Sequence, residues 1–419
     1  MIVIFKLFSP KDQLNLVIFS LLFINPNPII LVPGAFRTRL AVSVTSQNNL
    51  PKCPQNQTYF PFWISSKMLL KGKINCLINW LTLDYDDKKQ IITDQKNITV
   101  TPIDFGGIEG IRGTGDRIFG KSQPTYYEKI ISFLKKKNYT VGENIFGAPY
   151  DWRYGVAQPP IFWENLTNLV EIAYNKTHKK IKFLTHSCGG CIIHKFLTNI
   201  TTPEWRQKYI DSVIMSAPSF SGSGESLISL HRQRIPFIKF IRNDQVKEMV
   251  GSLGAFHVHI PNFIIFENTT VFLTPEGEII KGKNLLKFLI KQSKLTEKQL
   301  KIAKQNIHYI SSFPTSLDVP VKILYNSAIK TPFGLELKDW ENEGKVIYRN
   351  GDGIVMSEGI EMACEKWKLN GTDIQCKDIN SSSLFARHPF LILKDKFINV
   401  LLDWLIEPSN KTNSEDQEL

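Results

Sequence analysis

The chain has 419 residues, of which 42% are hydrophobic and 21% are charged, and this composition excludes a protein that is disordered throughout. Its formal net charge of +12 is compatible with an anionic partner. Neither a zinc-finger spacing nor a run of five or more basic residues accompanies that charge, so nucleic acid is not expected as a partner.

The first 24 residues predict a secretory signal peptide or signal anchor. Lys6 and Lys11 precede an apolar stretch over residues 17–24, which is shorter than the roughly 20 residues that a spanning helix needs. Asn-x-Ser/Thr sequons in the rest of the chain favour a secreted glycoprotein or one in a lysosomal or vacuolar lumen, although a chain rich in Asn and Thr also produces such sequons by chance. This context permits disulfides among the six cysteines.

Apolar runs of strand length alternate with amphipathic helical patterns along the chain. The runs predict strands over residues 28–32, 144–146, 181–185, 212–216, 321–325 and 345–348. Helical spacing predicts helices from Tyr127 to Leu134, from Phe162 to Ala173, from about Gly190, and over 390–406. Strands that alternate with helices predict an α/β fold with a mostly parallel sheet and helices on both faces.

Two segments depart from this alternation. Residues 219–315 show no alternation of strand and helix patterns, which predicts an inserted cap. A second insertion is predicted over residues 50–80, which include Cys53 and Cys76. The main domain is therefore expected over residues 25–408, followed by a polar tail over 409–419.

The turn after the strand at 181–185 carries a candidate nucleophile. Ser187 and Gly189 match the second half of a Gly-x-Ser-x-Gly motif, in which a sharp strand-to-helix turn presents a serine hydroxyl above the sheet edge. Thr185 replaces the first glycine, and a β-branched residue crowds that turn. The alternative is that Ser187 is an ordinary hydroxyl in a glycine-containing loop.

Two later residues complete the order Ser, acid, His that this fold uses. Asp352 stands between two glycines after the strand at 345–348, and an exposed Asp-Gly turn is the alternative interpretation. His388 follows it and is the candidate base. His257, His259 and His308 precede Asp352 and break the order, while His186 adjoins the nucleophile but is expected to point away from it.

Two other motifs suggest different chemistry. Residues 115–122 match the P-loop expression, but Asp116, Phe119 and the nearby Pro124 are unsuited to a phosphate-binding loop. Cys188 and Cys191 form a Cys-x-x-Cys at a helix N-terminus and make thiol-disulfide oxidoreductase the alternative function. Two buried structural thiols are the simpler interpretation.

At several positions the chain resembles the lecithin:cholesterol acyltransferase family, which includes lysosomal phospholipases A with transacylase activity and phospholipid:diacylglycerol acyltransferases. The matching segments are residues 28–34 (first core strand and oxyanion loop), 147–153 (the family's most characteristic segment), 185–189 (nucleophile elbow), Tyr325 with 331–332 (the strand and loop before the acid), 351–353 (acid) and His388 (base). The resemblance implies an α/β-hydrolase fold with inserted cap and lid segments.

The resemblance also implies a reaction without a cofactor or metal. A glycerophospholipid donates its acyl chain to Ser187, and the acyl-enzyme passes the chain to a sterol, diacylglycerol, another lipid alcohol or water. Backbone N–H groups of Ala35 and Cys188 would hold the oxyanion, although the family often has an acidic residue where Ala35 stands.

The resemblance further implies a disulfide between Cys53 and Cys76 that closes a membrane-contacting loop. Its lipid-contacting residues are expected to be Phe60, Phe62, Trp63, Leu69 and Leu70. The protein would then be peripheral on a membrane or lipoprotein-like surface, while packing of this loop on the core as a lid is the alternative. Cys364 lacks the family's usual partner and is expected to pair with Cys376.

Overall fold

The computed structural model describes residues 26–45, 53–63, 65, 68, 73–113, 126–235, 243–292, 295–340 and 344–407. The predicted signal segment, the predicted polar tail, the P-loop match, Leu69 and Leu70 lie outside these residues.

A six-stranded sheet forms the centre of the molecule, with the strand order β15-β12-β9-β8-β1-β7 and every neighbouring pair parallel. Its strands are β1 (Ile29–Val32), β7 (Ile145–Gly147), β8 (Ile181–His186), β9 (Ile210–Ser216), β12 (Val321–Tyr325) and β15 (Ile374–Asp378). Every residue of β1 and β8 is buried, as expected for parallel strands covered on both faces. Five of the six predicted strands lie in this sheet, whereas β15 was not predicted.

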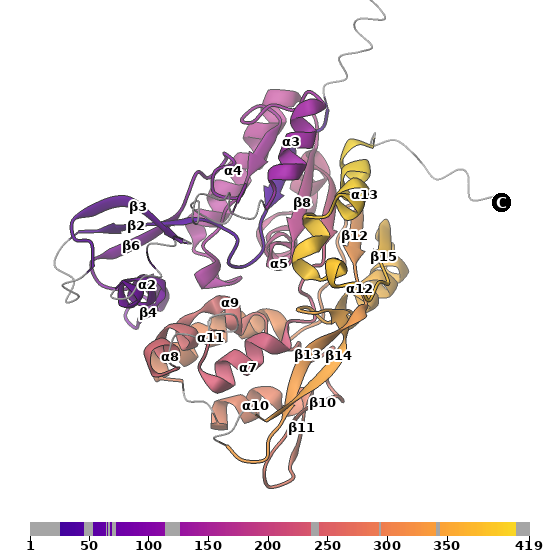
Figure 1. Cartoon of the computed structure of the whole chain (residues 1–419). Coiled ribbons are helices and arrows are strands. Elements are labelled where there is room, and N and C mark those ends of the chain that lie inside the picture. The colour runs from indigo at the N-terminus through magenta and orange to yellow at the C-terminus, as the bar shows by residue number, and fades with distance from the viewer. Residues whose placement is uncertain are drawn as a thin grey trace, which may run out of the picture.

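Helices cover both faces of the sheet, as the sequence predicts (Figure 1). Alternate residues of β1 belong to two different apolar clusters, Ile30 and Val32 to one and Ile29 and Leu31 to the other. The first cluster includes the buried residues of α4 (Pro160–Thr177) and α5 (Cys188–Lys195), and the second those of α3 (Glu128–Lys136) and α13 (Asp395–Ile406). A 3-10 turn, η5 (His388–Ile392), occupies the start of the predicted helix over 390–406.

The prediction that residues 345–348 form a strand is right, but the strand lies outside the parallel sheet. It is part of β14 (Lys345–Asp352), which pairs antiparallel with β13 (Ala328–Glu336). These two strands continue into β10 (Thr270–Leu273) and β11 (Ile279–Lys281) as a four-stranded sheet. Most of β14 is exposed or half-buried, and only its end at Gly351 and Asp352 is buried, which suits a hairpin with one solvated face better than a parallel core strand.

The segment expected as the cap forms a helical layer beside this second sheet. Its helices are α7 (Gly224–Arg232), α8 (Asn243–Ser252), α9 (Gly254–His257), α10 (Gly282–Gln292) and α11 (Glu297–Ile310). In Figure 1 they lie below the central sheet, around α7 and α9. Because β13 pairs with the cap strand β10 and β14 pairs with β13, the cap layer also includes residues 328–352.

The N-terminal insertion forms a third layer at the left of Figure 1. It consists of an antiparallel sheet in the order β3-β2-β6, the helix α2 and the hairpin β4-β5. Their bounds are β2 (Leu40–Val44), β3 (Gln57–Trp63), α2 (Ile74–Leu81), β4 (Leu83–Asp86), β5 (Ile91–Asp94) and β6 (Ile98–Pro102). A disulfide joins Cys53 to Cys76, with 5.5 Å between the Cα atoms.

Arg153, in the segment 147–153, connects this insertion to the core. The guanidinium is fully buried, and its Nη2 lies 2.6 Å from Oδ1 of Asp94 and 2.6 Å from Oδ2 of Asp151. Its Nη1 donates to the carbonyl of Trp80 at 2.9 Å. Buried charges are tolerated when they are paired and fully hydrogen-bonded, so these contacts hold α2 and β5 against the core.

Candidate functional site

Ser187 occupies the sharp turn between β8 and α5. Its backbone has φ 55° and ψ −126°, a conformation that costs free energy for a residue with a side chain and is typical of a nucleophile elbow. A Cβ atom at Gly189 would lie 2.6 Å from the carbonyl oxygen of Pro33 and 2.7 Å from that of Val32. Only glycine therefore lets α5 approach the end of β1, and Thr185 is accommodated fully buried at the end of β8.

Asp352 and His388 form a buried pair that comes from a strand end and from a 3-10 turn. Asp352 ends β14, and its Oδ1 accepts from the backbone N–H groups of Ile354 at 3.0 Å and Val355 at 2.8 Å. Its Oδ2 lies 2.6 Å from Nδ1 of His388, which begins η5 after β15. An ionised carboxylate here requires the proton on Nδ1, which leaves Nε2 of His388 as the acceptor that a general base needs.

The pair lies next to the elbow. The rings of His186 and His388 have centroids 4.7 Å apart, and Nε2 of His186 contacts the His388 carbonyl oxygen at 3.3 Å. The structure thus brings the predicted base beside the residue that precedes the predicted nucleophile. The cap histidine His259 contributes to the same region by contacting the hydroxyl of Ser219 at 2.9 Å.

The sequence predicts that the strand position of His186 points its side chain away from Ser187. Its side chain does point into the core, but it contacts Tyr126 and the backbone of His388 there. No motif in the sequence marks Tyr126, which precedes the amphipathic helix, so this contact could not be predicted. The side chains of His186 and Tyr126 are almost fully buried.

The predicted oxyanion donors flank the elbow. Cys188 is the first residue of α5, so its N–H has no intrahelical acceptor. Ala35 lies in a turn that closes between Arg37 N–H and the Gly34 carbonyl at 3.2 Å. A Cβ atom at Gly34 would lie 2.9 Å from Cβ of Ser187, so this loop packs directly against the serine.

The predicted membrane-contacting residues do not all lie at the surface. Phe62 is fully buried and packs edge-on against Trp80 with 5.5 Å between centroids, so its predicted contact with lipid is wrong. Phe60 is half-buried against the same indole, at 6.1 Å. Trp63 is also half-buried, and its Nε1 donates to the Phe36 carbonyl at 3.0 Å. Trp63 therefore braces the loop that carries Ala35, because its ring also packs on that of Phe36.

The cysteines pair as predicted, both in the bridge that the resemblance implies and in the bridge where the chain departs from the family. Cys53 is bonded to Cys76 and Cys364 to Cys376, whereas Cys188 and Cys191 are free and buried. Burial raises the pKa of the Cys188 thiol, and raises that of Cys191 to about 11. A redox thiol needs a lowered pKa and solvent access, so the structure does not favour the oxidoreductase alternative.

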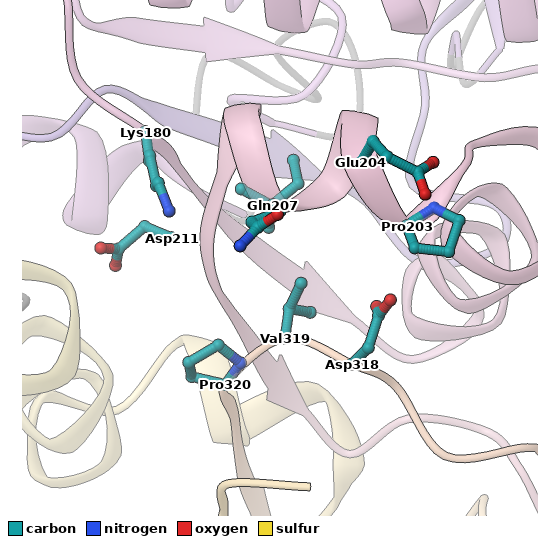
Figure 2. Close-up of a pocket in the computed structure, with 9 residues that line it drawn as sticks. Lys180, Pro203, Glu204, Gln207, Asp211, Asp318, Val319 and Pro320 are labelled. Carbon is teal, nitrogen blue, oxygen red and sulfur yellow. The ribbon is translucent and has the colours of Figure 1, made fainter.

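A large open pocket lies at the opposite edge of the central sheet, where β8, β9 and β12 begin. Its volume is about 540 Å³, and Lys180, Glu204, Asp211 and Asp318 are among its lining residues (Figure 2). Asp318 is engaged by Arg206 at 2.6 Å. Ligands of parallel sheets bind outside the carboxyl ends of the strands, so this pocket is not the candidate site.

Within the described ranges, no group of three or more His, Cys, Asp or Glu side chains is arranged to hold a metal ion. In the same part of the chain, every helix is too short or too polar to cross a bilayer.

Comparison with known proteins identifies a matching family model, related sequences and a solved structure of similar fold. The family model described as "Lecithin:cholesterol acyltransferase" matches residues 59–312. "Lecithin-cholesterol acyltransferase-like 1" of Arabidopsis thaliana is 28% identical over 218 residues, which cover 48% of this chain and only half of that protein. "Lysosomal phospholipase A and acyltransferase" of Canis lupus familiaris is 21% identical over 347 residues, 81% of this chain and 83% of that one. The Tle4–Tli4 complex contains a chain of similar fold, with a TM-score of 0.51, 11% identity, and coverage of 91% of this chain and 98% of that one.

Proposed function

Because the chain belongs to the lecithin:cholesterol acyltransferase family, we propose that Ser187, Asp352 and His388 are the catalytic triad of a lipid acyltransferase and phospholipase with an α/β-hydrolase fold. Its donor is a glycerophospholipid, and its acceptor is a lipid alcohol or water. The observation that carries the assignment is the 2.6 Å contact of His388 Nδ1 with Asp352, buried beside a serine elbow.

The first half of the reaction acylates the serine. His388 Nε2 takes the proton of the Ser187 hydroxyl while Oγ attacks the ester carbonyl, and the imidazolium is stabilised by the Asp352 carboxylate. The N–H groups of Ala35 and Cys188 stabilise the oxyanion of the tetrahedral intermediate, typically by about 3 kcal/mol per donor. When this intermediate collapses, the C–O bond to the lysolipid breaks and His388 returns the proton to the leaving oxygen.

The second half uses the same groups in reverse. His388 takes a proton from the hydroxyl of a lipid alcohol or of water, and that oxygen attacks the acyl-Ser187 ester. Collapse of the second intermediate releases the new ester or a fatty acid, and Ser187 recovers its proton from His388. The choice between transfer and hydrolysis therefore depends on which hydroxyl reaches the acyl-enzyme.

The proposed substrate requires contact with a lipid surface. Tyr59 at the start of β3 is 48% exposed, and Leu384 and Phe385, just before His388, are 66% and 62% exposed. The ammonium of Lys394 lies 4.4 Å from the centre of the Phe385 ring. Exposed apolar side chains beside a cation suit an interface with anionic head groups, which supports a peripheral position on membranes.

The proposed compartment rests on the two disulfides and on the predicted signal segment. Two disulfides in one chain suit an oxidising environment, as does the sequence's predicted signal segment. These features support a protein of the secretory pathway that is either secreted or in a lysosomal or vacuolar lumen.

The test incubates the purified protein with vesicles of acyl-labelled phosphatidylcholine and a panel of sterol, diacylglycerol and other lipid alcohols, followed by lipid chromatography. The parent protein should form labelled fatty acid or a new ester. Ser187→Ala should lower this activity at least about a thousandfold, while Ser212→Ala on β9 serves as the matched control. Ser187→Ala activity within tenfold of the parent would overturn the assignment, and insulin reduction without any lipid product would favour the thiol alternative.

A further inference from the structure

Tyr126 connects the two loops on which the proposed chemistry depends. Its hydroxyl lies 2.9 Å from the backbone nitrogen of Gly34, in the loop that carries Ala35. The same hydroxyl lies 2.8 Å from Nδ1 of His186, and Nε2 of His186 lies 3.3 Å from the carbonyl oxygen of His388. The three contacts form one continuous chain from the oxyanion loop to the base.

The direction of every hydrogen bond in this chain is determined. The His388 carbonyl can only accept, so Nε2 of His186 carries a proton and donates to it. In a neutral imidazole Nδ1 is then unprotonated and accepts the phenolic proton of Tyr126, whose oxygen accepts from the Gly34 N–H. The arrangement requires a neutral imidazole. Burial, followed by the nearby His388, holds the pKa of His186 well below its usual value, so this requirement is met.

Surrounding residues keep Tyr126 in place. The Arg37 guanidinium lies 5.4 Å from the centre of its ring, and the ring of Tyr127 packs at 4.6 Å. Tyr126 is 2% exposed, and burial raises the pKa of its phenol, which keeps the donated proton on the oxygen.

We propose that Tyr126 and His186 are positioning residues that hold the oxyanion loop and the backbone of the base at a fixed separation around Ser187. Neither residue touches the reacting atoms. Their effect is to keep the N–H of Ala35 and the imidazole of His388 aligned with the serine, because an error of about 1 Å in such alignment can cost a hundredfold in rate. This role rests on the proposed function of the triad.

Tyr127 provides a matched control within the chain. It is the adjacent tyrosine, it is also fully buried, and its hydroxyl donates to the carbonyl of Val32 at 2.9 Å. Tyr127→Phe therefore removes one buried hydroxyl of the same kind, but from a bond that anchors β1 and not from the chain that reaches His388.

The experiment measures hydrolysis of p-nitrophenyl butyrate, a soluble ester, by Tyr126→Phe and Tyr127→Phe. Turnover is counted per serine labelled by a fluorophosphonate, so unfolded protein does not enter the value. Tyr126→Phe should lower kcat by about tenfold to a hundredfold with KM within twofold, while Tyr127→Phe should stay within about twofold in both. Equal effects of the two substitutions, or a change confined to KM, would overturn the inference.

A double-substitution cycle separates positioning from general stability. Tyr126→Phe and His186→Leu interrupt the same chain, so the double variant should lose no more kcat than His186→Leu alone, whereas independent structural effects would multiply. His186→Asn offers an acceptor near the place of Nδ1 and should recover part of the loss. Multiplicative losses without this recovery would refute the role. An active Ser187→Ala would show that the proposed function, and not this inference alone, had failed.

Discussion

Replacement of Asp352 by asparagine should invert the tautomer of His388 while leaving the fold intact. In the parent, Oδ1 of Asp352 accepts two backbone N–H bonds and Oδ2 faces Nδ1 of His388. The asparagine oxygen must take the Oδ1 position, because an NH2 group there would oppose the N–H groups of Ile354 and Val355. The amide NH2 then donates to Nδ1, which moves the imidazole proton to Nε2, where it blocks proton transfer from Ser187.

The expected decrease in kcat follows from the free energy needed to restore the active tautomer of His388. Rotating the amide of Asp352→Asn would leave the buried N–H of Val355 and the half-buried N–H of Ile354 without acceptors, at about 1–3 kcal/mol each. This cost of about 2–6 kcal/mol corresponds to roughly 30-fold to 26,000-fold in the active population. Loss of the carboxylate charge that stabilises the imidazolium adds to it, so kcat should fall by about three to four orders of magnitude.

The assay is the pre-steady-state and steady-state hydrolysis of p-nitrophenyl butyrate by Asp352→Asn. Thermal unfolding is followed in parallel and should shift by only a few degrees, because the two backbone bonds remain. Asp378→Asn is the control, since this carboxylate ends β15 of the central sheet and also accepts two backbone bonds, from Ser327 and Asn380. A decrease of less than tenfold for Asp352→Asn in folded protein would refute the reasoning, as would an equal decrease for Asp378→Asn.

Three further outcomes are expected. Trp63→Phe keeps an aromatic ring but removes the hydrogen bond to the Phe36 carbonyl, so kcat should fall about threefold to tenfold. The decrease should be the same on vesicles and on a soluble ester, and a loss on vesicles alone would support lipid contact instead. Burial raises the pKa of Cys191 to about 11, so this thiol should resist iodoacetamide at pH 8 and react only after unfolding; fast alkylation of folded protein would contradict its burial. Because the folded pKa exceeds the unfolded value of about 8.5, the thiol contributes fully to stability below pH 8.5, and this contribution declines as the pH rises toward 11. Arg153→Met removes the cation between the buried Asp151 and the half-buried Asp94, so urea titration should show a stability loss of about 3–5 kcal/mol. A loss below 1 kcal/mol would show that this ion pairing contributes little.

The sequence by itself predicts the parts of this protein that depend on local patterns. Apolar runs bounded by turns identify five strands of the parallel sheet, and helical spacing identifies the helices that cover it. The serine turn, the acid between two glycines and the later histidine are visible because each needs particular residue types within a few positions. Chain order then relates the three residues without any knowledge of their distances.

Only the tertiary structure decided which side chains meet across the chain. The strand at 345–348 reads like a core strand, but its pairing with β13 places Asp352 at the end of a separate sheet. The sequence predicts Phe62 as a membrane anchor, but in the folded protein Phe62 packs against Trp80 and is buried. The hydrogen bond from Gly34 to Tyr126 spans 92 positions and that from Tyr126 to His186 spans 60. Such contacts depend on how whole layers pack, because burial and the choice of hydrogen-bond partners are properties of the folded core and leave no periodic trace in the sequence.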